Sequence, residues 1–214
     1  MGEKRVVPRP LRRLLDWDTV MTDKFVKYVD RNYGPISKYK TTMKALEYSC
    51  HGIPWLLGTA AFIFLLQAAS SRQLLVNIFI ALIVDIVVVG VVKAITRRRR
   101  PATNKTEEML VVVMMDKFSF PSGHCTRAVM LSVVISMQYD LFLPLWVLLQ
   151  GWSGAVCVSR ILLNRHHLLD VFGGIVIGVL EAWLMSQLWL SETSTAAVVN
   201  SFLDETQAGA SYDI

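Results

Sequence analysis

Five long apolar stretches constrain the fold of this chain more than any other feature of its sequence. They are Ile53–Ala69, Leu74–Val92, Cys125–Leu143, Pro144–Leu163 and Leu168–Leu190. A helix needs about 20 predominantly apolar residues to cross a bilayer, within a range of roughly 17–25. Only 18% of the residues are charged, whereas about 25% are charged in a soluble domain. We therefore expect an all-α membrane protein, a bundle of about five transmembrane helices.

An amphipathic segment precedes these stretches. Apolar side chains recur at helical spacing in residues 14–31, namely Leu14, Trp17, Met21, Phe25, Tyr28 and Val29, while acids and lysines fill the other face. Such a helix lies on a membrane surface more readily than it crosses one, because each central charge costs about 2.5–3.5 kcal/mol to insert. We expect a basic flexible tail (1–13), a membrane-embedded domain (14–190) that opens with this N-terminal interfacial helix, and an acidic flexible tail (191–214).

The distribution of charge predicts the orientation. Residues 1–50 carry eleven Lys and Arg against six Asp and Glu, and residues 191–214 carry four acids and no Lys or Arg. The excess of basic residues on cytoplasmic segments places the N-terminus in the cytosol. With five spans, residues 93–124 and the junction 160–167 lie on the same side. Because of the apolar spans, we assign the basic end to an anionic membrane surface and expect no nucleic-acid partner.

Three polar motifs fall where the apolar stretches meet that side, within Lys93–Pro101, Pro121–His124 and Ser159–Asp170. The predicted topology therefore brings them to one surface, although they are far apart in the sequence. This convergence points to a common site more strongly than any of the three motifs does alone, since short motifs arise easily by chance.

The residue types of the motifs suit phosphate chemistry. Lys93, Arg100 and Arg160 supply fixed cations for phosphoryl oxygens. Ser122 and Gly123 begin a helix, whose free N–H groups and dipole attract anions. We therefore predict that these five residues bind the phosphate of a substrate.

Two histidines and one acid complete the predicted site. His166 and Asp170 are four residues apart, so on a helix they share a face. The carboxylate would hold one ring nitrogen of His166 and leave the other free to attack phosphorus, with His124 as the proton donor to the leaving oxygen. We expect His167 to point away, toward the membrane interface. No cluster of Asp, Glu and His resembles a catalytic metal site, so we expect no metal and no cofactor.

The combined set KxxxxxxRP, PSGH and SRxxxxxHxxxD resembles the type 2 phosphatidic acid phosphatase superfamily, which includes lipid phosphate phosphatases and bacterial acid phosphatases. Every signature position is filled. The resemblance implies a metal-independent phosphatase in which His166 is the nucleophile, Asp170 the orienting acid and His124 the general acid. It also implies a phosphohistidine intermediate that water hydrolyses.

Residues 51–58, 97–102 and 116–128 carry a narrower similarity, which extends over residues 14–190. They resemble the animal polyisoprenoid diphosphate phosphatases, also called presqualene diphosphate phosphatases. This similarity implies presqualene, farnesyl and geranylgeranyl diphosphates as substrates. It also implies the membranes of the endoplasmic reticulum and nuclear envelope as the location, and the predicted orientation then places the active site on the cytosolic face.

Several alternatives stay open on the sequence. The substrate is alternatively a glycerolipid or sphingolipid phosphate such as phosphatidate or lysophosphatidate, and an inactive scaffold of the same fold is a further option. The oligomeric state is open, a homo-oligomer included. The mid-span acids Asp85 and Glu181 are either functional or protonated and hydrogen-bonded to a neighbouring helix. Residues Arg97–Arg99 either hold a second phosphate or reach toward lipid headgroups.

Overall fold

The computed structural model describes residues 8–101 and 118–210, with residues 203–210 described by their backbone alone. Within these ranges the regular structure is helical, apart from an isolated bridge between Arg99 and Phe118. The elements are α1 (Arg9–Tyr33), the 3-10 helix η1 (Ile36–Tyr39), α2 (Lys40–Ser49), α3 (Gly52–Leu65), α4 (Ala69–Thr96), α5 (Gly123–Gln138), α6 (Leu143–Leu162), α7 (Leu168–Gln187) and α8 (Glu192–Ala210). The predicted all-α class is confirmed.

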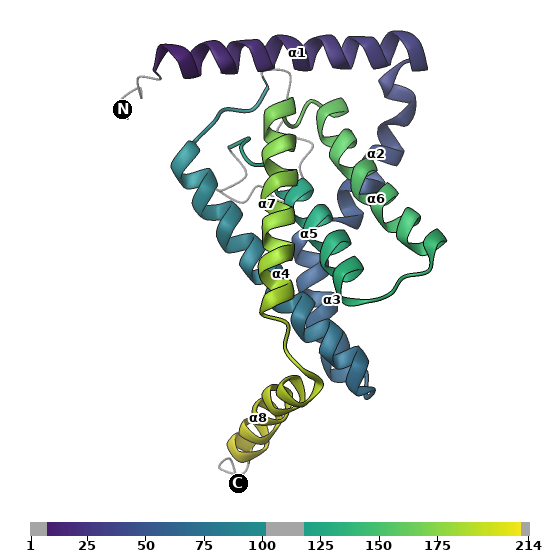
Figure 1. The fold of residues 1–214 in the computed structure, drawn as a ribbon, viewed down its shortest axis with the longest axis vertical. Coiled ribbons are helices and arrows are strands. Elements are labelled where there is room, and N and C mark those ends of the chain that lie inside the picture. Colours follow the sequence, from purple (N-terminus) through teal and green to yellow (C-terminus); the bar gives the residue numbers. More distant parts are fainter. Residues whose placement is uncertain (1–7, 102–117, 211–214) are drawn as a thin grey trace.

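Helices α3 to α7 form the bundle and correspond to the five predicted apolar stretches (Figure 1). The short connections 66–68 and 139–142 make α3–α4 and α5–α6 antiparallel hairpins, as the sequence predicts. The main core lies between α4, α5 and α7, where Leu82, Met130 and Ala182 are fully buried. Helix α5 is central, because it packs against α4, α6 and α7.

The number of membrane spans differs from the expected five. Among the described helices, three are long and apolar enough to cross a membrane, namely α4, α6 and α7, and a fourth span results if Ile36–Ser49 and Gly52–Leu65, bent by 45°, cross together. Helix α3 has 14 residues and α5 has 16, which at 1.5 Å per residue reach about 21 and 24 Å across a core of about 30 Å. The prediction ran on through residues 139–142 because three of these four residues, all except Asp140, have side chains that also suit a membrane helix.

Helix α1 lies across the end of the bundle at which α7 begins (Figure 1). It starts at Arg9, so it includes residues assigned above to the flexible tail. Two prolines mark this start, Pro8 as the N-cap and Pro10 in the first turn, where a missing N–H breaks no helical hydrogen bond. The helix ends before Gly34, whose φ of +90° suits glycine.

Helix α8 occupies most of the expected acidic tail, at the opposite end of the bundle (Figure 1). It packs against α4. Val199 is buried there in a cluster with Ile63 and Val76. The acids of this segment indicated a solvated tail, but its apolar side chains are enough to dock it on the bundle.

Two glycines of α7 set its distance from α5. A Cβ at Gly178 would lie 2.6 Å from the carbonyl oxygen of Thr126, and one at Gly174 would lie 3.0 Å from that of Ser122. Small residues let two helix backbones approach closely. The close approach places the beginning of α7 directly beside the beginning of α5.

Candidate active site

The three sequence motifs lie at one end of the bundle, the end covered by α1. Lys93 is in the last turn of α4, Ser122 caps α5, and Arg160 is in the last turn of α6. Backbone hydrogen bonds join the segments. Ser119 N donates to the carbonyl of Arg98 at 2.8 Å, and Ser122 N donates to the carbonyl of Asp170 at 3.1 Å. The beginnings of α5 and α7 are therefore linked directly through their backbones.

A tight loop carries His166 between α6 and α7. Asn164 has φ +53°, a left-handed conformation that asparagine tolerates. The N–H groups of Arg165 and His166 then both donate to the carbonyl of Arg160, at 3.0 and 3.2 Å. The loop is thereby folded onto the last turn of α6, which brings the ring of His166 next to the Arg160 side chain.

The tautomer of His166 follows from its hydrogen bond. Its Nδ1 lies 2.8 Å from the carbonyl oxygen of Ser119. A carbonyl only accepts, so Nδ1 carries the proton and Nε2 of the neutral ring bears a lone pair. Burial lowers the pKa of His166 well below 6.5, and the positive charges of Arg100, Arg160 and Lys93 lower it further. The ring is therefore neutral, with Nε2 available to act as the predicted nucleophile, and it is close to three of the predicted phosphate-binding cations.

Asp170 lies beside His166 as predicted, but no hydrogen bond joins its carboxylate to the His166 ring. The nearest Asp170 oxygen, Oδ2, lies 3.9 Å from His166 Nδ1. It instead accepts from the backbone N–H of His167 at 2.8 Å and lies 3.2 Å from His167 Nδ1. The i, i+4 argument needs both residues on one helix, but α7 begins only at Leu168. Ser119, which the sequence analysis did not single out, holds the His166 ring through its carbonyl.

His167 is buried as the N-cap of α7, with 6% of its surface exposed, so the expected interfacial position is also wrong. Asp170 closes a capping box with it. This arrangement satisfies N–H groups that a helix start leaves without partners. Asp170 therefore fixes the end of the His166 loop rather than the His166 ring.

Buried polar atoms without protein hydrogen-bond partners gather around this loop. In the described part of the chain they include all three guanidinium nitrogens of Arg160, Oγ of Ser122 and Nε2 of His124. Arg160 is 1% exposed, and its counter-ion Glu47 lies 3.2 Å away without hydrogen-bond geometry. Buried donors left unpaired are costly, and a phosphate would supply acceptors to them.

His124 stands in the first turn of α5, close to a histidine that the sequence analysis assigned no role. The His51 ring meets the His124 ring edge-on, with 6.2 Å between centroids. His51 is the N-cap of α3, so the N-terminal part of the chain reaches the site. The only earlier signal for it was its place within the similarity over residues 51–58.

Gly123 and Arg100 complete the predicted set. A Cβ at Gly123 would meet only Val89 Cγ1, at 3.4 Å, which is ordinary contact and gives no steric reason for glycine. Its backbone nevertheless opens α5. Arg100 lines a cavity of about 380 Å³ together with residues of α1, Arg98 and Arg99. This cavity lies beside the His166 loop, because Asn164 and His167 also line it.

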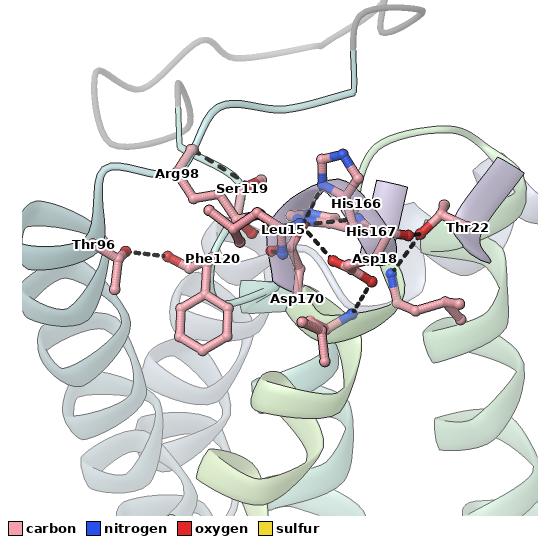
Figure 2. Close-up of polar contacts among 12 residues, drawn as sticks. Leu15, Asp18, Thr22, Thr96, Arg98, Ser119, Phe120, His166, His167 and Asp170 are labelled. Carbon is pink, nitrogen blue, oxygen red and sulfur yellow. Dashed lines mark hydrogen bonds and ion pairs between the residues drawn. The ribbon is translucent and has the colours of Figure 1, made fainter. Parts of the chain in front are cut away.

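Arg98 holds neither a second phosphate nor lipid headgroups. Its guanidinium bridges two fully buried carboxylates, donating to Asp18 Oδ2 at 2.5 Å and to Asp170 Oδ1 at 2.8 Å (Figure 2). Asp18 belongs to α1 and was assigned to the polar face of that helix. The structure places it on the face toward the bundle.

The mid-span acids have different surroundings. Asp85 is fully buried and pairs with Arg127 of α5 at 2.6 Å, and it accepts from Thr126 Oγ1 at 2.6 Å. It is thus hydrogen-bonded to a neighbouring helix as expected, and the partner there is the guanidinium of Arg127. Both carboxylate oxygens of Glu181 are buried and lack hydrogen-bond partners among the described residues.

The described residues contain no group of three or more His, Cys, Asp and Glu placed to hold a metal ion. The buried donors around Arg160 suit an anion instead. Metal independence remains a prediction.

Comparisons with known proteins place the chain in a family. Residues 74–193 match the model of the PAP2 superfamily. The curated "Probable lipid phosphate phosphatase beta" of Arabidopsis thaliana is 32% identical in an alignment of 142 positions. The match covers 55% of this chain and 66% of that protein, slightly less than two thirds of the relative's length. The crystal structure of Aquifex aeolicus LpxE has a TM-score of 0.58 at 20% identity, over 77% of this chain and 93% of that one, which shows a shared fold.

The narrower similarity to polyisoprenoid diphosphate phosphatases stays a prediction. The family match covers more than half of the chain and includes all three motifs, and this chain therefore belongs to the PAP2 superfamily.

Proposed function

We propose that this protein is a membrane phosphatase that removes phosphate from a lipid phosphate or diphosphate through a phosphohistidine at His166. The observation that carries the proposal is a buried set of polar atoms without hydrogen-bond partners, on Arg160, Ser122 and His124. They lie beside a neutral His166 whose Nε2 bears a lone pair. Such a site lacks only a tetrahedral anion with acceptor oxygens.

The first proposed step forms the phosphoryl enzyme. Nε2 of His166 attacks phosphorus and the bond to the lipid oxygen breaks. His124, which takes up a proton when the charge of the bound phosphate offsets the surrounding cations, gives that proton to the leaving oxygen and becomes neutral. Positive charge develops on the His166 ring as the new bond forms. The Ser119 carbonyl, which accepts from Nδ1, stabilises that charge, while Arg160, Arg100 and Lys93 stabilise the phosphoryl oxygens.

The second proposed step returns the enzyme to its starting state. Water attacks phosphorus and gives a proton to His124, the bond between phosphorus and Nε2 breaks, and inorganic phosphate leaves. The net reaction consumes one water and needs no metal or cofactor.

A lipid substrate is supported by the position of the site. It lies at the end of the bundle across which α1 extends, and α4, α6 and α7 are apolar enough to cross a membrane. We propose polyisoprenoid diphosphates as the substrates on the sequence similarity given above, with glycerolipid and sphingolipid phosphates as the competing class. The name of the Arabidopsis relative also refers to a lipid phosphate.

The proposed location is the endoplasmic reticulum and nuclear envelope, with the site facing the cytosol. The basic N-terminal segment supports this orientation. A protease site inserted near Asn104, outside the described residues, should be cut from the outside of sealed microsomes. Full protection would place the site in the lumen.

A substrate panel tests the activity. The purified protein in detergent with EDTA should release phosphate from farnesyl, geranylgeranyl and presqualene diphosphates faster than from phosphatidate or lysophosphatidate. The His166→Ala protein serves as the control. Faster turnover of the glycerolipids would favour the competing class, and no release from any lipid by a folded protein would support the inactive scaffold.

A further inference from the structure

Two polar residues interrupt the apolar face that α1 turns toward the bundle. Asp18 is fully buried and Thr22 is 2% exposed. They stand at helical spacing with Leu11, Phe25 and Val29, that is, at positions of an apolar stripe. A buried carboxylate on the contact face of a surface helix is expensive unless it is paired. Its partners therefore indicate what it does.

The partners are the free N–H groups at the start of α7. Thr22 Oγ1 accepts from the backbone N–H of Leu168 at 3.0 Å, and Asp18 Oδ1 accepts from that of Leu169 at 3.1 Å (Figure 2). These are the first two helical positions, whose N–H groups have no acceptor within their own helix. Helix α1 thus caps the helix that directly follows the His166 loop.

A second connection runs through Arg98. Asp18 Oδ2 and Asp170 Oδ1 share its guanidinium. The Arg98 carbonyl accepts from Ser119 N, and the Ser119 carbonyl accepts from His166 Nδ1. Asp18 is therefore connected to both supports of His166. It contacts the first turn of α7 directly, and through Arg98 it is linked to Ser119, whose carbonyl holds the His166 ring.

We infer that Asp18 and Thr22 of α1 are positioning residues for the nucleophile, which hold the His166 loop and Arg98 in the geometry needed for phosphoryl transfer. The inference rests on the proposed function. Neither residue belongs to the three motifs, and neither is among the residues that contact the phosphate in the proposed mechanism. Their effect should appear in the rate of the chemical step and not in phosphate binding.

The test uses conservative variants with chemically matched controls. Asp18→Asn keeps the oxygen acceptor for Leu169 but removes the charge that pairs with Arg98, and Thr22→Val removes the acceptor for Leu168 with little change in shape. Asp140→Asn and Thr42→Val make the same chemical changes at exposed positions that do not line the cavity beside the His166 loop. Thr22→Ser restores a hydroxyl acceptor and should behave as wild type.

The first readout is amide hydrogen exchange of the full-length protein in detergent, which does not depend on activity. We expect exchange at the start of α7 to be at least tenfold faster in Thr22→Val and in Asp18→Asn, and unchanged in the two controls and in Thr22→Ser. Unchanged exchange in the first two variants, or equal acceleration in the controls, would overturn the inference.

The second readout is kinetics on the best lipid of the panel. We expect kcat of Asp18→Asn and Thr22→Val to fall at least tenfold, with KM and the inhibition constant of inorganic phosphate within twofold of wild type, because Arg160 and its neighbours are unaltered. A rise in KM at unchanged kcat would show that α1 acts in binding and would overturn the positioning role. If wild type itself turns over no lipid phosphate, the proposed function fails, while the exchange result still decides whether α1 orders the loop.

Discussion

Neutralising Asp85 should destabilise the bundle strongly. Asp85 is fully buried in α4, and its carboxylate lies 2.6 Å from Nη2 of Arg127 and 2.6 Å from Oγ1 of Thr126. Asp85→Asn leaves the buried Arg127 guanidinium without its counter-charge, with only neutral acceptors such as the amide oxygen and the Cys50 carbonyl, which lies 3.2 Å from Nη1. The loss therefore includes the penalty of an uncompensated buried charge as well as the loss of one ion pair.

The size of the effect follows from that penalty. Removing one partner of a buried pair costs about 3–5 kcal/mol, whereas replacing both by apolar residues of similar volume is often neutral. A chain of this size loses about 2–4 °C in Tm per kcal/mol, so Asp85→Asn should lower Tm by about 6–20 °C. The double variant Asp85→Leu/Arg127→Met should recover most of that loss.

Thermal unfolding in detergent, followed by circular dichroism, measures both variants. Asp140→Asn, which removes a charge at an exposed position between α5 and α6, is the control and should leave Tm within a few degrees of wild type. The reasoning is refuted if Asp85→Asn shifts Tm no more than the control does. It is equally refuted if the double variant is as unstable as the single one.

Four further outcomes are expected. His166→Ala should abolish turnover, and His124→Ala should reduce it by about 10²–10⁴-fold as expected for a general acid; near-normal turnover by purified His166→Ala would remove the nucleophile assignment. Lipid phosphate release should continue in EDTA, and its abolition by EDTA with rescue by magnesium would contradict a metal-independent reaction. Millimolar vanadate should inhibit release, because its five-coordinate form mimics the in-line transition state. Burial and neighbouring cations lower the pKa of His166 well below 6.5, so protonation should inactivate the nucleophile only at lower pH. The acidic limb of the kcat/KM profile should therefore have its midpoint below pH 6.5. A midpoint at pH 6.5 or above would argue against a neutral, pre-formed nucleophile. Gly178→Ala, whose new Cβ would lie 2.6 Å from the Thr126 carbonyl, should cost about 1–3 kcal/mol through overpacking, and unfolding measurements that show no loss would disprove the close contact.

The grouping of the three motifs was predictable because it needed only the order of the helices and their approximate ends. Lys93, Ser122 and Arg160 stand at helix ends, and a bundle brings alternate ends together whatever its detailed packing. The number of spans was less predictable. Loops rich in large hydrophobic side chains, such as residues 139–142 despite Asp140, are hard to tell from helix by hydropathy. A buried central helix like α5 also need not be long or uniformly apolar.

Contacts that depend on where a helix begins could not be predicted. The predicted bond between His166 and Asp170 assumed one continuous helix, but α7 begins only after His167. The Asp170 carboxylate therefore accepts from the backbone N–H of His167, and the His166 ring donates to the Ser119 carbonyl. Every residue has a backbone carbonyl, so the sequence does not indicate which one will accept a hydrogen bond from a given side chain. Asp18 did leave a signal, a charge inside an apolar stripe, but the larger number of solvated acids on α1 concealed it.

The segment that defines the family does not contain everything the site uses. Residues 74–193 match the family model, yet Asp18, Thr22, Glu47 and His51 all lie before residue 74 and contact groups within it. An excised segment, or a chimera that grafts it onto the N-terminal helices of another member, would leave Arg98, Arg160 and the first amides of α7 without these partners. The unit that can be transferred between proteins as a working module therefore begins no later than α1.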